Sequence, residues 1–256
     1  MNLSTRSLAV PSLSRCLISL VVGLSAVYAG AVSAQAYPTK PIKAIVPFAA
    51  GSATDQIARA FAAKMGEILE QPVVVENKAG VNGMLGADVA AKSAPDGYTI
   101  LIGTNSTNAA LKSLMKKLPY DQDTAFAPVA YLGSVPLIIA VNNDVPVKTL
   151  AEFVAMAKAK PEKVTFASAS TSQLVSSEVL ASMTNIKMTN VPYKSGPAAM
   201  TDLIGGQVNM FSADFAVMLP QVKAGKVRGL AVTSTKRSKA IPELPTVNEA
   251  LGLKDY

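Results

Sequence analysis

Apolar and polar positions alternate along the chain in blocks that predict strands followed by helices. The first block begins with an apolar run at 41–48, passes through a small polar loop at 49–55 and then changes period. The apolar residues that recur at helical spacing after the loop are Ile57, Ala58, Phe61, Ala62, Met65 and Leu69. This spacing predicts a helix with one stripe facing a core. A strand end therefore lies beside the first amides of a helix, where an anion can bind without a charged side chain.

Ser52 and Asp55 give this helix start two possible roles. Their spacing is that of a capping box, in which a hydroxyl and a carboxylate satisfy the first amides of the helix. A cluster of this kind is more often a cap than a ligand site. Both interpretations stay open for any one loop.

The same order of strand, polar loop and helix recurs along the chain. Further strands are predicted at 73–76, 98–102, 135–141, 164–167, 188–191, 208–211 and 227–233. Polar segments follow three of them, at 103–108, 168–172 and 212–214. Alternating strands and helices predict an α/β fold. In open parallel sheets ligands bind beyond the carboxyl ends of the strands, so these loops together favour a binding protein.

Residues 1–36 predict a signal peptide. They contain Arg6 and Arg15, no acidic residue, and an apolar stretch from Cys16 to about position 32. Small residues at Ala34 and Ala36 fit a cleavage site near these positions. A transmembrane anchor is the competing interpretation, but the run is shorter than the ~20 apolar residues of a membrane span. We therefore expect an exported, periplasmic mature chain.

Composition excludes several chemistries. The 256 residues include no histidine and one cysteine, which lies in the predicted signal peptide. Serine or cysteine catalysis that depends on histidine is thereby excluded, as are the usual zinc sites. The net charge of +7 is scattered, without the aromatic interleaving of a nucleic-acid surface. We expect no metal, no cofactor and no nucleic-acid partner, while carboxylate or lysine chemistry stays open.

Two domains are expected in the mature chain. The segment 121–133 has little helical period and precedes a strong strand, so the first crossing between domains is placed there. The first domain would comprise 37–133 and 229–256, and the second 134–228. The last predicted strand would carry the chain back to the first domain.

Several motifs, in this order and spacing, carry a resemblance to a known family. They lie at 37–42, 46–55, 72–77, 95–99, 118–121, 191–194 and 230–234. The chain resembles the substrate-binding proteins of tripartite tricarboxylate transporters, also called Bug receptors. The resemblance implies a two-domain, type II-like periplasmic binding protein that closes on a small carboxylate between its lobes. It also implies a monomer that contacts integral membrane transporter subunits transiently.

The resemblance also implies a set of ligand-binding residues. They are Gly51, Ser52, Thr54 and Asp55 in the first loop, Thr104, Asn105, Ser106 and Asn108 in the second, Ser168, Ser170, Thr171 and Ser172 in the third, and Asp214. Backbone amides and hydroxyls would hold the carboxylate oxygens. Asp55 would order its loop instead of touching an anion, because like charges repel.

Two other functions stay open on the sequence. An exported α/β enzyme could use Asp214 and Lys194, and it would lose turnover without a matching loss of binding when Asp214 is changed to Asn. A protein that presents its ligand to a sensor would use the same cleft. The sequence does not separate the sensor from the transport receptor.

Family chains continue for several tens of residues beyond the segment 242–246, whereas this sequence stops at Tyr256. We expect the first domain to be incomplete, to expose apolar faces and to pack loosely. Amide hydrogen exchange checks this expectation: residues 41–103 should exchange rapidly. Full protection across these residues would contradict it.

Overall fold

A computed structural model of the chain describes residues 36–161 and 163–256. Residues Lys40–Tyr256 form a compact unit that holds all the helices and strands described below. The predicted signal peptide at 1–36 lies outside the described residues except for its last position.

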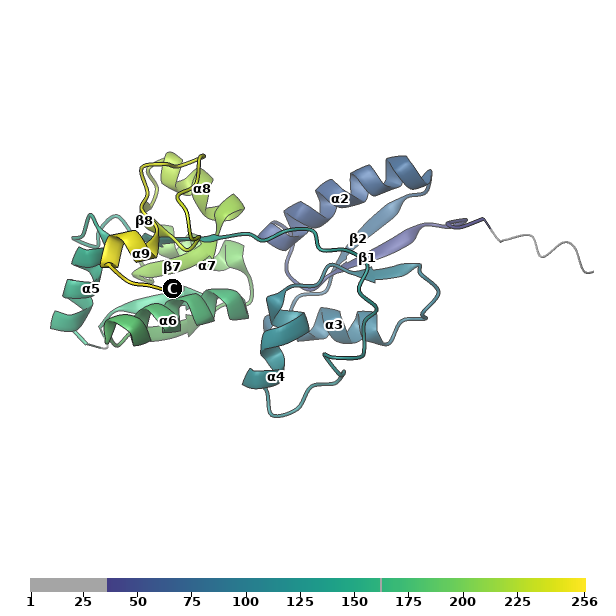
Figure 1. Cartoon of the computed structure of the whole chain (residues 1–256), viewed down its shortest axis with the longest axis horizontal. Coiled ribbons are helices and arrows are strands. Elements are labelled where there is room, and N and C mark those ends of the chain that lie inside the picture. Colours follow the sequence, from purple (N-terminus) through teal and green to yellow (C-terminus); the bar gives the residue numbers. More distant parts are fainter. Residues whose placement is uncertain (1–35, 162) are drawn as a thin grey trace, which may run out of the picture. The chain divides into compact units, whose positions relative to one another are not determined.

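The first sheet has three parallel strands in the order β2-β1-β3 (Figure 1). The strands are β1 (Ile42–Val46), β2 (Val73–Asn77) and β3 (Thr99–Leu101). Strand β1 is central, and four of its five residues, Ile42, Ala44, Ile45 and Val46, are buried. Parallel neighbours need crossover connections. Helices α2 (Ala53–Leu69) and α3 (Met84–Ala91) provide them.

Helix α2 is buried along a narrower stripe than its sequence predicts. Ala58 and Ala62 are buried, as expected, but Phe61 is 38% exposed. The buried face is shifted toward the start of the helix, where Ala53 and Asp55 are also covered. The helix therefore contacts the sheet through small residues, and its first turn is the most enclosed part.

Short helical segments complete this part of the chain. They are the 3-10 turn η1 (Val81–Gly83), the π-helical segment η2 (Ser106–Ala110) and α4 (Leu111–Leu114). Segment η2 begins within the predicted polar loop at 103–108. π-Helical turns are rare and often lie at functional sites.

The second sheet has five strands in the order β6-β5-β7-β4-β8. Its strands are β4 (Leu137–Val141), β5 (Thr165–Ser168), β6 (Thr189–Pro192), β7 (Met210–Asp214) and β8 (Arg228–Val232). Its helices are α5 (Leu150–Ala159), α6 (Thr171–Thr184), α7 (Gly196–Ile204), α8 (Phe215–Lys223) and α9 (Val247–Leu251). Strand β5 pairs in parallel with β6 and β7, whereas β4 pairs antiparallel with β7 and β8.

Both faces of the five-stranded sheet are covered, which explains the continuous apolar run in β4. Ile139 and Val141 belong to a core formed with α5, α6 and α9, whereas Ile138 and Ala140 belong to a core formed with α7 and α8. Successive side chains of a strand point to opposite faces. A strand buried on both faces therefore has no polar positions.

Residues 229–256 do not return to the first sheet, contrary to the prediction, because their strand pairs within the second sheet. Strand β8 is an edge strand of the second sheet, where Val232 pairs with Ile138 of β4. Val247 of α9 lies in the same core as Phe153 of α5. The apolar residues of this segment have their partners in the second sheet, so packing keeps them there. The boundary at 133 and 134 stays a prediction.

Strand β7 extends further than its sequence predicts. The predicted strand ended at residue 211, but β7 continues through Asp214, which pairs with Leu137 of β4. Ladder hydrogen bonds use backbone groups, so Ser212 and Asp214 can take part in the sheet. Within 36–161 and 163–256, no helix is both long and apolar enough to cross a membrane.

We expect Phe153→Ala to lower the free energy of unfolding by about 3–5 kcal/mol, because it leaves a cavity in the core between α5 and the sheet. Phe153 is fully buried. Urea unfolding monitored by circular dichroism measures the change. Val175→Ala is the control, since Val175 is 43% exposed; a loss of similar size in the control would contradict the assigned core.

Candidate functional site

The loop between β1 and α2 is held by a buried carboxylate. Ser52 is the N-cap of α2, and its hydroxyl accepts a hydrogen bond from the Asp55 N–H (3.3 Å). The carboxylate of Asp55 accepts from the Gly51 N–H (2.9 Å) and from Nε of Arg59 (3.0 Å). Gly51 has a φ of 79°, in the left-handed region that favours glycine. Asp55 therefore closes the loop onto the first turn of its own helix.

Asn77, at the end of β2, ties the loop to the neighbouring strand. Its Nδ2 donates to Oδ1 of Asp55 (2.8 Å) and to the carbonyl oxygen of Phe48 (3.0 Å). Its Oδ1 accepts from Arg59 (3.1 Å). The loop is thus fixed at both ends by one amide side chain. No local sequence pattern marks Asn77 as a residue of this loop.

Hydrogen bonds hold Asp55 in its ionised form. Burial raises the pKa of this carboxyl, but hydrogen bonds from Arg59, the Gly51 N–H and Asn77, together with the charge of Arg59, outweigh burial. The pKa of Asp55 therefore lies below its usual value. All these partners belong to the protein, so the geometry assigns this carboxylate to the loop.

The segment after β3 adds a second polar loop. Thr104 and Ser106 line a pocket, whereas Thr107 points inward, with its hydroxyl accepting from the Thr104 N–H (2.9 Å). The hydroxyl of Thr107 donates to Oδ1 of Asn108 (2.6 Å). The buried Oγ1 of Thr104 has no hydrogen-bond partner within the described part of the chain. This hydroxyl can therefore bond to a group that enters the pocket.

The loop after β5 leads into α6. Ser170 is the N-cap, and its hydroxyl accepts from the Gln173 N–H (3.5 Å). The N–H of Thr171, the first residue of α6, donates to Oγ of Ser106 (3.2 Å). This hydrogen bond joins the start of α6 to the polar loop that follows the three-stranded sheet.

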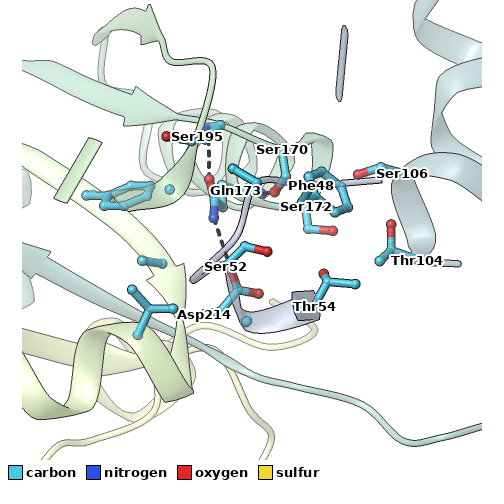
Figure 2. A pocket seen from close by; sticks show the side chains of 17 residues that line it. Phe48, Ser52, Thr54, Thr104, Ser106, Ser170, Ser172, Gln173, Ser195 and Asp214 are labelled. Carbon is cyan, nitrogen blue, oxygen red and sulfur yellow. Dashed lines mark hydrogen bonds between the residues drawn. The ribbon is translucent and has the colours of Figure 1, made fainter. Parts of the chain in front are cut away.

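Gln173 orients a carboxylate in the pocket. Its Oε1 accepts from the Ala169 N–H (2.8 Å), so its amide NH2 group is directed to Oδ2 of Asp214 (3.1 Å; Figure 2). Gln173 is 4% exposed. Burial raises the pKa of Asp214, and the hydrogen bond from Gln173 offsets part of the rise. Asp214 therefore retains a proton more readily than an exposed aspartate.

The lining residues of the pocket come partly from the first turns of four helices. The space between its lining residues, part of which is open to solvent, is about 610 Å³. Its lining residues are Phe48, Ala49, Ser52, Ala53, Thr54, Thr104, Ser106, Ala169, Ser170, Ser172, Gln173, Ser195, Gly196, Phe211, Ala213, Asp214 and Val217. Among these residues Asp214 is the only ionisable one, and none is basic. The first turns of α2, α6, α7 and α8 all contribute, so their partial positive charges converge on the pocket.

The structure brings some of the predicted ligand residues to the pocket and not others. Those that line it are Ser52, Thr54, Thr104, Ser106, Ser170, Ser172 and Asp214; those that do not are Gly51, Asp55, Asn105, Asn108, Ser168 and Thr171. Most of the second group have structural partners. Ser168, for example, donates through Oγ to Oδ1 of Asn190 (2.7 Å).

Several lining residues were missed by the sequence analysis. Four of them lie just outside the polar loops that the sequence predicts: Phe48, Gln173, Ser195 and Val217. Ser195 had a usable signal, because it precedes a helix with proline at its start and is the N-cap of α7. Gln173 had no such sequence signal, because its role depends on Asp214, which lies in strand β7.

Comparisons with known proteins agree with this architecture. A family model described as "Tripartite tricarboxylate transporter family receptor" matches residues 57–256. Protein BugT of Bordetella pertussis is 38% identical over 242 residues, which cover 92% of this chain and 74% of BugT. A protein from the tcbD-tcbE intergenic region of Pseudomonas sp. strain P51 is 36% identical, over 94% of this chain and 72% of its own length.

Solved structures are similar over most of the chain. The structure of R. palustris Rpa4515 with adipate has a TM-score of 0.82 at 33% identity, covering 84% of this chain and 73% of that one. The structure of MatC (Rpa3494) from Rhodopseudomonas palustris with bound malate has a TM-score of 0.79 at 31% identity, covering 84% and 74%.

We expect Asp55→Asn to lower the free energy of unfolding by about 1–3 kcal/mol near neutral pH, because it removes the negative charge that pairs with Arg59 and replaces one of the two accepting oxygens with an NH2 group. The pKa of Asp55 is depressed on folding, so its contribution is complete above the unfolded carboxyl pKa of about 3.9. The contribution is lost as the pH falls through the lowered folded pKa.

Urea unfolding of both proteins across this pH range tests the assignment. The difference in unfolding free energy should shrink as the pH falls below about 4. Asp144→Asn, a change at an exposed carboxylate, is the control. A difference between Asp55→Asn and the parent protein that does not change with pH would contradict the role given to the ionised carboxylate.

Proposed function

Because the chain belongs to the tripartite tricarboxylate transporter receptor family, we propose that it is a periplasmic receptor that binds a small carboxylate in this pocket. On this proposal the ligand lies between the loops of the two sheets. The receptor then presents it to integral membrane subunits of a transporter.

The observation that carries the proposal is the convergence of four helix starts on a pocket without a basic side chain. The first turns of α2, α6, α7 and α8 contribute lining residues. Helix N-termini favour anions through their free N–H groups and the helix dipole. The surrounding hydroxyls of Ser52, Thr54, Ser172 and Thr104 can donate further hydrogen bonds. A carboxylate fits this donor set because each of its oxygens accepts two hydrogen bonds.

The acids bound in similar proteins indicate the size of the ligand that we propose for this chain. Structures of Rpa4515 and MatC contain adipate and malate, respectively. We propose an acid of about this size for the present chain.

The enzyme alternative finds less support in the geometry. Lys194, its proposed partner for Asp214, is exposed and does not line the pocket. Asp214 is instead paired with the amide of Gln173. We therefore propose a binding protein without catalytic activity, which acts as a monomer. Presentation of the ligand to a sensor would use the same pocket.

A thermal melt of protein expressed from the full sequence, with and without a panel of small carboxylates, tests the proposal. A ligand that binds only the folded state stabilises it by about 2.7 kcal/mol at a hundred times its Kd, so one acid should raise the Tm. If no acid in the panel raises the Tm of a cooperatively folding protein, the receptor proposal is wrong.

Ser172→Ala should weaken the binding of that acid about 10- to 100-fold, because it removes a hydrogen bond to a charged group. Its Tm without ligand should stay close to that of the parent protein. Ser182→Ala is the matched control, since Ser182 is an exposed serine near the other end of α6. Equal affinities of Ser172→Ala and Ser182→Ala would remove Ser172 from the site.

A further inference from the structure

Residues 80–83, which are the N-cap and the three residues of η1, form a left-handed turn with an unusual backbone. All four have positive φ angles: 144° at Gly80, 48° at Val81, 54° at Asn82 and 91° at Gly83. Positive φ is uncommon outside glycine, and for a β-branched residue it is a genuine outlier. Val81 is the only β-branched residue with positive φ within 36–161 and 163–256. Strained backbone persists where the surrounding structure requires it, and it clusters at ligand sites.

The left-handed turn brings Gly83 into close contact with two other segments. The Gly83 N–H donates to the carbonyl oxygen of Gly80 (3.0 Å), which closes the turn, and Gly83 is buried. A methyl group on its Cα would lie 2.9 Å from Cγ2 of Thr107 and 3.2 Å from Cζ of Phe48. Non-bonded carbon atoms prefer separations of about 3.5–4.0 Å. The missing side chain at Gly83 therefore makes room for the Thr107 methyl group and the Phe48 ring.

Both neighbours of Gly83 belong to segments that form the pocket. Phe48 follows β1 and lines the pocket directly (Figure 2). Thr107 is fully buried, and its hydroxyl accepts from the N–H of Thr104, which is a lining residue. Gly83 itself is not among the lining residues. Phe48 and Thr107 thus separate Gly83 from the pocket, and the left-handed turn supports two pocket loops from behind.

The Phe48 ring is the bulky lining group that the rest of the fold fixes least. The other large apolar lining residues are Phe211, which is fully buried in β7, and Val217, which lies in α8. Phe48 lies in the loop between β1 and α2 and is partly exposed. Its carbonyl oxygen accepts from Nδ2 of Asn77 (3.0 Å), which fixes the backbone but not the ring. The position of the ring therefore depends on its packing against Gly83.

We propose that Gly83 is a positioning residue that acts through Phe48 and determines how long an acid the pocket accepts. This inference rests on the proposed receptor function. Because the left-handed turn leaves space for the ring on the side away from the pocket, the ring leaves room for the carbon chain of the ligand. A side chain at Gly83 would displace the ring toward the pocket, where it would meet the far end of a long acid. The donors at the helix starts belong to other residues, so a short acid would lose little.

The affinities of unbranched dicarboxylates of increasing length test the inference. Isothermal titration calorimetry on protein expressed from the full sequence compares malonate, succinate, glutarate, adipate and pimelate. We define the length preference as the ratio of the Kd of the longest acid bound by the parent protein to that of the shortest. Gly83→Ala should raise this ratio about tenfold, because overpacking of one methyl group typically has a cost of this order.

A matched control separates this effect from backbone strain. Gly252 is also a left-handed glycine beside a helix, with a φ of 63°, but a methyl group there would have no atom of the described residues within 4 Å. Alanine is strained at positive φ, so Gly252→Ala should lower the Tm as Gly83→Ala does. The length preference of Gly252→Ala should equal that of the parent protein.

Two compensating changes keep the test decisive if Gly83→Ala alone folds poorly. Thr107→Ser removes the methyl group nearest to Gly83 and retains the hydroxyl that accepts from Thr104, so it relieves the closest contact while the contact with Phe48 remains. Gly83→Ala combined with Thr107→Ser should therefore fold and still have the raised ratio. Adding Phe48→Leu, which removes Cζ, should restore the affinity for the longest acid.

Each outcome bears on a different claim. If Gly83→Ala, alone or with Thr107→Ser, has the length preference of Gly252→Ala, the inference is wrong and the receptor proposal stands. If the ratio rises but Phe48→Leu does not restore the affinity for the longest acid, Gly83 does not act through Phe48 and the inference is also wrong. If no acid binds to the parent protein, the receptor proposal fails and the inference fails with it.

Discussion

The pocket depends on a constraint that applies to every helix start: the first N–H groups have no partner within the helix. Ser52, Ser170 and Ser195 meet this constraint for α2, α6 and α7, each accepting from the N–H three residues later. The same three serines line the pocket. A cap satisfies part of the first turn, and the other amides of that turn can still bind a ligand. Capping and ligand binding are therefore compatible at these positions.

The fourth helix start differs in chemistry. Helix α8 begins at Asp214, whose side chain makes no capping hydrogen bond and is held by Gln173. The carboxylates of Asp55 and Asp214 also differ from each other. Asp55 is surrounded by protein donors that hold its pKa below the usual value, whereas at Asp214 burial outweighs the hydrogen bonds and raises the pKa. The first orders a loop, and the second lines the pocket.

Much of the fold could be predicted because it depends on local patterns. Apolar runs identified all eight strands described in residues 36–161 and 163–256, and the cap at Ser52 followed from its spacing to Asp55. The placement of β8 could not be predicted in this way. A strand that is apolar on both faces fits either sheet, and its pairing with β4 depends on tertiary packing.

The residues of the candidate site also differ in whether local sequence can identify them. Strand ends and helix starts indicated the polar loops from local sequence, and the resemblance to the receptor family implied that Ser52, Thr54, Ser170 and Ser172 within them contact the ligand; these four residues line the pocket. Asn77 and Gln173 act through partners distant in sequence, since Asn77 bonds to Asp55 and Gln173 to Asp214. Single-sequence patterns carry no information on such pairs.

On the proposed function, amides and hydroxyls at the helix starts hold a carboxylate without a basic side chain. A crystal structure of the protein with a bound acid is the decisive measurement. We expect carboxylate oxygens about 2.7–3.2 Å from N–H and hydroxyl donors in the first turns of α2 and α6. An acid bound to lysine or arginine side chains, with no contact to these helix starts, would contradict it.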